Sequence, residues 1–478
     1  MSTETNFKIA IPDPRKSTAT AIIVFALTVL PPRRSHAEDS VDAKFMYYQE
    51  DKDRIKVLAP EISVQQETDT GWIIKLDGIY NSISGATPTG APPTAPAPVN
   101  TVRSAPTASS SSPTPTAPTV TTGGGNDRTP EGEDDALLLR RSNFPAARYS
   151  AVTAATPAPA PTPAPAPSGT TTATPAPSST PASSGASSSS TTQQAAQPAS
   201  SSRIPLADFE DTRWAFNIGL SKRVGDHTPG VQASYSQESD YLSTGLSLQD
   251  AIEFNKKNTI LAVGGAYTHD SLTPANGRPS EAKDSIDALL GISQVLTKTT
   301  VLTANFTHGQ VSGFISDPYK LSEVNGQLVY ENRPDSKTKE ILYVGLQQFI
   351  TPLDASIDLG VRYYTDSFGI NAETFSLAWF QKVTPGFIIS PIVRYYTQTA
   401  ADFYDVRFSG TPEFYSSDYR VSDLTSISYG VKFIWMPSAK LTLDAGVERY
   451  EMSGNDGKTD PEMYPTALLF LVGAHMSF

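Results

Sequence analysis

Apolar and polar residues alternate with a period of two through most of the folded part of this chain. In the segment 356–364, one face carries apolar and aromatic residues from Ile357 to Tyr363, while the other carries small or charged residues. The same alternation recurs in the segments 214–221, 389–396, 426–435 and 441–448. Successive side chains of a strand point to opposite faces, so the pattern predicts strands with one apolar and one polar side.

About sixteen such strands can be placed along the sequence. Three lie at Ala43–Gln49, Ile55–Gln66 and Trp72–Ser82. The other thirteen begin near Trp214, Val231, Tyr241, Thr259, Ser285, Thr300, Ile341, Ser356, Thr374, Ile388, Ser426, Leu441 and Ala467. Bacterial membrane barrels have an even number of strands, which this count satisfies. Pro60 and Pro391 each remove a ladder donor from a predicted strand, so we expect local bulges at both positions.

The connections between these strands alternate in length. Short links, such as Thr68–Gly71 and Pro385-Gly386, interleave with long polar loops. The long loops cover roughly Thr273–Lys283, Phe314–Lys337, Asp405–Asp423 and Asn455–Pro465. Short turns at one end and long loops at the other favour an all-β transmembrane antiparallel barrel over a soluble sandwich. With both chain ends periplasmic, the long loops would be extracellular.

Composition divides the chain into four parts. Residues 1–37 are predicted to be a secretory signal peptide, because Arg15 and Lys16 precede an apolar run from Ala19 to Leu30 and small residues follow at Ser35-His36-Ala37. Residues 38–85 form the first barrel strands, and residues 203–478 form the remaining strands. Residues 86–202 are almost all Pro, Ala, Ser, Thr and Gly, which predicts a long disordered extracellular loop.

Aromatic residues and the last strand both fit a membrane barrel. The chain has 20 Tyr, 20 Phe and 4 Trp, and the alternation turns Tyr235, Tyr267, Tyr363 and Tyr395 outward, where we expect an aromatic girdle at the membrane boundary. The final strand places five residues on one face, in the manner of the assembly signal of bacterial outer-membrane proteins. They are Phe470, Val472, Ala474, Met476 and Phe478.

Charge and cysteine content exclude several classes of function. The net charge of −12 argues against a nucleic-acid partner, because no basic excess is present to neutralise phosphates. The absence of cysteine excludes disulfides and thiolate metal sites. We therefore expect no cofactor and no metal. The expected partners are outer-membrane lipids, the periplasmic chaperones, the barrel-assembly machinery, and an unidentified solute or partner protein.

The polar face offers candidate lumen residues of both signs. They are Asp358, Arg362, Arg394, Lys432, Asp444 and Glu448. These side chains could form a charged constriction that selects solutes, or an internal lattice of ion pairs that stiffens or plugs the barrel. The first interpretation predicts a solute channel or export conduit. The second predicts a plugged scaffold for binding or display, in which the 86–202 insert contacts a ligand or partner.

Catalysis is the least favoured function at this stage. Only His227, His269, His308 and His475 follow the predicted signal peptide. His269, next to Asp270, lies near an extracellular strand end and could belong to a hydrolase at the rim. The sequence contains no serine elbow, metal-binding histidine pair or glycine-rich phosphate loop, so we expect that the protein is not an enzyme.

Several short motifs occur in a fixed order along the chain. They include Tyr47–Glu50, Ser82–Ala86, Ser316–Lys320, Arg362–Gly369, Arg394–Tyr404 and Glu448–Glu451. Together they resemble the bacterial "domain of unknown function 3570" family of outer-membrane barrels. The resemblance implies a barrel in the outer membrane but no particular chemistry, and the 86–202 insert departs from the family pattern. Ser316–Lys320 and Ala400–Tyr404 lie at predicted loop roots, where they could bind a ligand or hold the loops in place.

Overall fold

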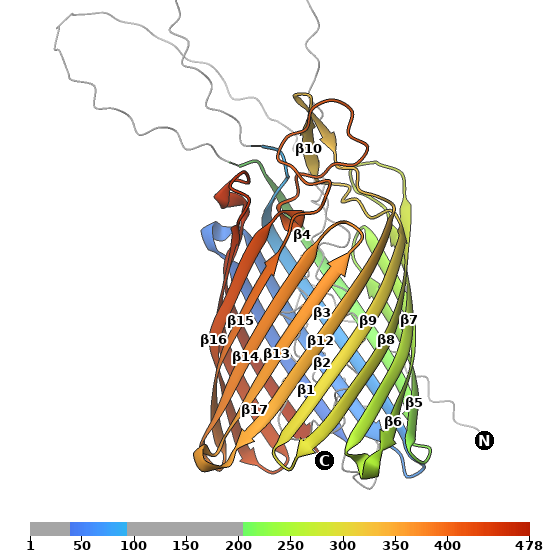
Figure 1. Cartoon of the computed structure of the whole chain (residues 1–478), viewed down its shortest axis with the longest axis vertical. Helices are drawn as coiled ribbons and strands as arrows, with labels where there is room; N and C mark the ends of the chain where they lie inside the picture. Colours follow the sequence, from blue (N-terminus) through green and yellow to red (C-terminus); the bar gives the residue numbers. More distant parts are fainter. Residues whose placement is uncertain (1–38, 93–203) are drawn as a thin grey trace, which may run out of the picture.

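Sixteen antiparallel strands close into one barrel in the computed structural model, which describes residues 39–92 and 204–478 (Figure 1). The fold class predicted from the alternation is therefore confirmed. The barrel strands are β1 (Ser40–Glu50), β2 (Ile55–Glu67), β3 (Trp72–Pro88), β4 (Leu206–Lys222), β5 (His227–Gln237), β6 (Tyr241–Phe254), β7 (Thr259–Leu272), β8 (Glu281–Thr297), β9 (Thr300–Gly313), β12 (Ser336–Ile350), β13 (Ala355–Asp366), β14 (Asn371–Thr384), β15 (Phe387–Gln398), β16 (Leu424–Ser438), β17 (Leu441–Gly454) and β18 (Thr466–Ser477).

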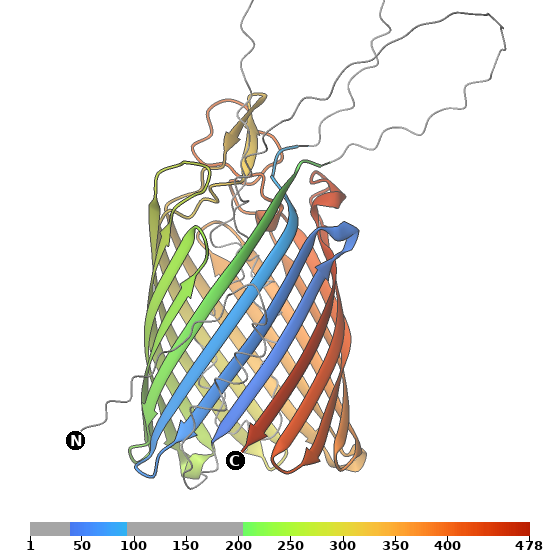
Figure 2. The same ribbon diagram turned by 180° about the vertical axis from the view of Figure 1, so that it is seen from behind.

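Pairing of the first and last strands closes the barrel. β1 and β18 lie side by side, in register from Ser40 opposite Ser477 to Glu50 opposite Ala467 (Figure 2). Closure satisfies the backbone groups that an open sheet would leave unpaired at its two edges. A closed β-barrel is one of the two architectures that can cross a lipid bilayer with its backbone hydrogen bonds satisfied.

The two ends of the barrel differ, as predicted. One end, the short-turn end, is made of tight links that include the 3₁₀ turns η4 (Asn255–Lys257) and η5 (Thr351–Leu353). The other, the long-loop end, carries η1 (Asp51–Asp53), η6 (Tyr419–Val421), η7 (Pro461–Met463) and the hairpin β10 (Leu321–Val324) and β11 (Gln327–Tyr330). Asn325 and Gly326 join this hairpin with φ of 53° and 78°, the left-handed geometry that an Asn-Gly turn favours. None of the described helices is long and apolar enough to span a membrane.

Large apolar side chains cover the outside of the barrel. The most exposed include Phe216 and Ile218 on β4, Leu246 and Leu248 on β6, and Ile286 on β8. Residues between them along each strand turn inward and are mostly small, polar or charged. An apolar surface of this extent is incompatible with water and matches the lipid-facing band of a membrane barrel.

The predicted bulges at the two prolines are wrong. Pro60 lies opposite Phe45 and Pro391 opposite Val431, and the register continues past both without a shift. Each proline has no ladder partner on the other neighbouring strand. For Pro60 that strand is β3, and the ladder between β2 and β3 is interrupted between the pairs Leu58–Ser82 and Glu61–Ile79. The missing N–H is thus accommodated by an interrupted ladder rather than by an inserted residue. The register shifts in the described strands occur instead beside short turns, for example between Lys382 and Thr384.

Parts of the predicted domain division lie outside the described residues. These are the signal peptide at 1–37 and nearly all of the 86–202 insert. β3 continues to Pro88, so that Ala86, Thr87 and Pro88 pair with β4. The insert falls between β3 and β4, which meet the long-loop end of the barrel (Figure 1).

Candidate functional site

The predicted lumen residues all lie on inward positions of four strands. Asp358 and Arg362 are on β13, Arg394 is on β15, Lys432 is on β16, and Asp444 and Glu448 are on β17. Two are almost completely buried, with exposed fractions of 4% for Arg394 and 3% for Glu448. Burial of charged groups requires partners, so the contacts of these six side chains determine what the wall can do.

The structure brings some of these residues together but not all of them. Lys432 Nζ lies 3.0 Å from Asp444 Oδ2, an ion pair between β16 and β17. Asp358 Oδ2 instead accepts a hydrogen bond of 3.2 Å from the Gln347 amide. The guanidinium groups of Arg362 and Arg394 lie over the rings of Tyr364 and Tyr396, at 5.6 and 5.7 Å from the ring centres.

A small cavity lies beside this group. Its volume is about 30 Å³, and Lys44, Ser390, Lys432, Asp444 and Glu448 are among the residues that line it. This volume holds about one water molecule. The cavity is therefore a gap in a packed wall rather than a solute pocket.

Ion pairs continue around the rest of the wall. They join inward positions of neighbouring strands, as in Lys283–Asp270 at 3.5 Å and Lys337–Asp366 at 3.1 Å, or reach across one strand, as in Lys339–Asp287 at 3.4 Å across β9. His475 and Asp42 close the series across the β1–β18 seam at 2.9 Å. Because the two signs alternate, the wall presents no ring of one charge.

A second charged group lies above the wall, where two long loops meet. We call it the mouth latch and define it as Asp317, Glu331 and Arg333 of the loop 314–335, with Asp418 and Arg420 of the loop 399–423. Arg333 Nε lies 2.8 Å from Glu331 Oε1, and Arg333 Nη2 lies 2.9 Å from Asp418 Oδ2. Arg420 donates from Nε to Asp418 Oδ1 at 2.9 Å and from Nη2 to Asp317 Oδ2 at 3.1 Å. All five residues are buried.

Burial and charge act in opposite directions on the latch carboxyls. Burial raises the pKa of Glu331, and the Arg333 guanidinium only partly offsets that shift. Burial would also raise the pKa of Asp418, but Arg420, Lys320 and Arg333 together hold that pKa well below its usual range. Asp418 is therefore the anion on which both arginines converge, and it ties the two loops to each other.

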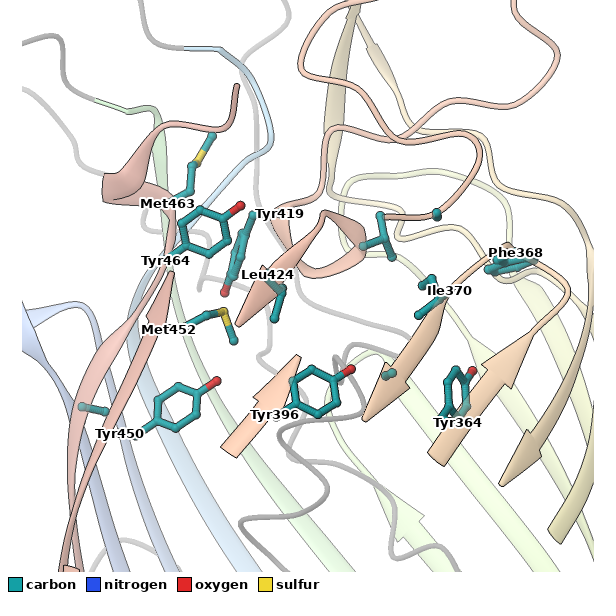
Figure 3. Close-up of a cluster of buried hydrophobic side chains, with 14 of the residues drawn as sticks. Tyr364, Phe368, Ile370, Tyr396, Tyr419, Leu424, Tyr450, Met452, Met463 and Tyr464 are labelled. Carbon is teal, nitrogen blue, oxygen red and sulfur yellow. The ribbon is translucent and has the colours of Figure 1, made fainter. Parts of the chain in front are cut away.

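An apolar cluster supports the latch from one side of the mouth (Figure 3). Tyr419 and Tyr464, from two different loops, pack edge to face with ring centres 5.7 Å apart. The Ser422 and Tyr464 hydroxyls lie 2.8 Å apart. Below them Tyr396 and Tyr450 project from the inner wall, so loops and strands share one buried core at this end.

The segment Ser316–Lys320 holds its loop in place across the mouth. The Tyr319 hydroxyl donates to Asp240 Oδ2 at 2.6 Å and accepts from the Ala275 N–H at 2.8 Å. Lys320 Nζ donates to the carbonyl of Pro88 at the end of β3. These partners come from two other loops and from the end of β3. Of the two interpretations of this motif, the contacts favour loop fixation. In Ala400–Tyr404, Ala401 N–H similarly bonds Val421 O within the loop, at 2.9 Å.

Sequence reasoning missed a group of three carboxylates near Tyr319. Asp211, Glu238 and Asp240 each place an oxygen within 4.8 Å of the others, and all three residues are buried. Such oxygens suit a hard cation. Arg213, at 3.8 Å from Glu238, and the Tyr319 hydroxyl already offset part of this charge. Asp211 lies on β4 and the other two follow β5, so only the strand register reveals the group.

The predicted girdle and assembly residues lie on the outside of the barrel. Tyr235, Tyr267, Tyr363 and Tyr395 are all exposed, each near the long-loop end of its strand. The sequence analysis missed a second set at the short-turn end, where Trp72 and Trp435 are exposed next to turns. On β18, beside β1, the outward residues Phe470, Val472 and Met476 are exposed, with Ala474 between them half-buried. Phe478 N–H bonds Asp39 O at 3.1 Å.

Comparison with solved structures finds barrels of low sequence identity. The ferric enterobactin receptor PfeA (mutant G324V) of Pseudomonas aeruginosa is 9% identical, with 88% of this chain and 54% of that chain aligned and a TM-score of 0.38. The siderophore receptor PirA of Acinetobacter baumannii is 10% identical, with the same coverage and TM-score. This chain thus spans about half the length of these receptors. The outer membrane protein opdK of Pseudomonas aeruginosa is 9% identical, with 92% and 99% aligned and a TM-score of 0.36.

Comparison at the level of sequence finds a family but no individual relative. No curated protein matches the chain. The model of the family described as "Protein of unknown function (DUF3570)" matches residues 16–285 and 278–467, which include the insert between β3 and β4. The chain therefore belongs to the DUF3570 family.

Proposed function

We propose that this chain is an outer-membrane channel or export conduit for polar solutes, whose extracellular mouth is closed by the mouth latch. The observation that carries the proposal is the inward face of the sixteen-strand barrel, where charged and polar side chains form ion pairs between apolar patches at the mouth and near Phe380, Ile388 and Ile434. A barrel of this size is wide enough for an aqueous passage. A wall made for packing alone would be expected to carry few charged side chains, because each one must leave water.

The proposed location follows from the outer surface. The exposed apolar side chains on the outside of the barrel are stable only in contact with the hydrocarbon of a bilayer. Export of the chain through its predicted signal peptide would deliver it to the periplasm. We propose that periplasmic chaperones and the barrel-assembly machinery then insert it, with outer-membrane lipids as its permanent neighbours. The long-loop end would face the cell exterior, as in other barrels of this type.

Four of the six predicted lumen residues have a role in the proposed passage. Lys432 and Asp444 offset each other, so the wall would attract neither cations nor anions strongly. Arg394 on β15 and Glu448 on β17 both point inward and are buried in the closed barrel, and in an open lumen they would contact a polar solute by hydrogen bonds. Such a passage would select by size and polarity rather than by net charge.

The mouth latch would be the gate. Removing one partner of a buried ion pair is strongly destabilising, by about 3–5 kcal/mol, because it leaves the other charge uncompensated. Separating the two loops breaks contacts of Asp418 with Arg333 and of Asp317 with Arg420 at once. An open state therefore requires a ligand, a partner or a membrane potential that supplies this free energy.

Conductance in planar bilayers tests the proposal. The wild-type protein is expected to conduct rarely, and the Arg333→Ala, Arg420→Ala double variant to give frequent ohmic steps. Adding Arg394→Ala to the double variant should change the step size, because Arg394 lines the passage. Lys52→Ala is a matched control, since its pair with Glu462 is exposed and lies outside the latch. Absence of steps from every variant, including one that lacks the insert, would contradict a channel.

The plugged scaffold remains the second candidate because a specific observation favours it. Loops and wall share one apolar core at the mouth, which would hold the loops in place even after the latch is cut. In that case the double variant would stay silent in bilayers while retaining the heat-dependent gel shift of a folded barrel.

A further inference from the structure

A serine, a histidine and an aspartate lie in hydrogen-bonding order on the outside of the barrel. His269 Nδ1 lies 2.8 Å from Asp284 Oδ1, and His269 Nε2 lies 3.5 Å from Ser271 Oγ. His269 and Ser271 are two positions apart on β7, so both side chains point the same way. Asp284 is directly opposite His269 on β8.

The partner of His269 is not its neighbour in sequence. Asp270 points into the lumen, where it is buried and faces Lys283 at 3.5 Å. Asp284, from the next strand, faces outward together with His269, and the two side chains are 46% and 44% exposed. Tyr267 lies two residues before His269 on the same face of β7. Its hydroxyl donates a second hydrogen bond of 2.6 Å to the same Asp284 oxygen and holds the carboxylate in place.

We propose that Ser271, His269 and Asp284 form a hydrolytic triad that acts on acyl esters of membrane lipids. In such a triad the carboxylate keeps the proton on Nδ1, which leaves Nε2 free to take the serine proton. The arrangement has that order, with the longer contact at the serine. Catalytic hydrogen bonds are often long before substrate binds.

The position of the triad identifies the class of substrate. It lies at the long-loop end of the lipid-facing surface, directly above the exposed side chains of Leu246 and Ile286, which flank Tyr267 on the neighbouring strands. Acyl chains packed along this apolar surface would bring their ester groups to the level of Ser271. A water-soluble ester would not enter the lipid layer that covers this face, because it has no apolar chain to bury there.

The reaction balances with water as the only co-substrate. Ser271 Oγ forms a bond to the ester carbonyl carbon as its proton passes to His269 Nε2. The bond to the alcohol oxygen breaks, and the alcohol leaves with that proton. Water then attacks the acyl-serine, gives one proton to Nε2, and releases the fatty acid as Ser271 regains its hydrogen.

The proposal is tested on purified full-length protein in mixed micelles with phosphatidylethanolamine in one assay and lipid A in another, in buffer with calcium and magnesium. Release of fatty acid in either assay supports the proposal, and the assay that responds identifies the lipid. Ser271→Ala and His269→Ala should each reduce the rate at least ~100-fold, and Asp284→Asn by a similar factor. A fluorophosphonate probe should label Ser271 in the folded protein.

His308→Ala is the matched control. His308 is equally exposed at the same end of the barrel and pairs with Glu340 at 3.7 Å, and its replacement should leave the rate unchanged. The heat-dependent gel shift of each variant reports whether the barrel is folded. Absence of hydrolysis and of probe labelling in folded wild-type protein would overturn the triad. So would activity that survives Ser271→Ala. Neither result bears on the channel, which is tested by conductance.

Discussion

The buried charged residues of the mouth latch and of the inner wall pair with residues of opposite sign. The three carboxylates of the mouth latch, Asp317, Glu331 and Asp418, meet Arg333 and Arg420 within it, and Lys320 adds a third cation from the same loop. On the wall, lysines and aspartates pair between neighbouring strands, as in Lys283–Asp270 and Lys432–Asp444. Such pairs contribute less to net stability than to the specificity of an arrangement, because desolvation offsets most of the attraction.

Glycine has a specific role at Gly430, on the inward face of β16. A Cβ atom there would lie 2.3 Å from the carbonyl oxygen of Val447 on β17, which is too close. Gly430→Ala is therefore expected to lower the free energy of unfolding by about 1–3 kcal/mol. Urea unfolding in lipid vesicles, followed by tryptophan fluorescence, measures the change.

Gly446 provides the matched control for this substitution. It lies on the inward face of β17, but its nearest contact, the Val431 carbonyl, would be 3.6 Å from an added Cβ. Gly446→Ala should change stability by much less than Gly430→Ala. Equal effects of the two substitutions would contradict the close packing of β16 against β17.

At the scale of the element, the strands were predictable and their partners were not. Alternation fixes which side chains face lipid, so the sixteen strands and the outward position of Tyr363 could be predicted from local sequence alone. The pairing of His269 with Asp284 rather than with Asp270 depends on the register of β7 and β8. The mouth latch joins residues about a hundred positions apart, as in Asp317 and Arg420, through loops that carry no periodicity.

The two faces of one strand should respond differently to the same substitution. Leu290 on β8 faces lipid, while its neighbour Leu289 faces the lumen. Leu290→Arg is expected to destabilise the barrel by about 2–4 kcal/mol, because the charge would lie in hydrocarbon. Leu289→Arg, which places the charge on the polar side, should have a clearly smaller effect in the same vesicle unfolding assay. A reversed order would show that the faces are misassigned.

At the scale of the whole molecule, the barrel keeps three features apart. The charged inner wall and the mouth latch serve the proposed passage. The proposed triad of Ser271, His269 and Asp284 lies on the outer surface, where membrane lipids would have access to it. The insert leaves the barrel between β3 and β4, at the end where the latch lies. All three assignments require that the long-loop end faces the cell exterior.

Cysteine labelling in cells tests that orientation, and with it the membrane barrel, most directly. The chain contains no cysteine, so a single introduced thiol is the only target for a membrane-impermeant maleimide. Lys458→Cys, in the loop between β17 and β18, should react in intact cells. Lys298→Cys, in the turn between β8 and β9, should react only after the outer membrane is permeabilised. Equal labelling of both positions in intact cells would contradict the account.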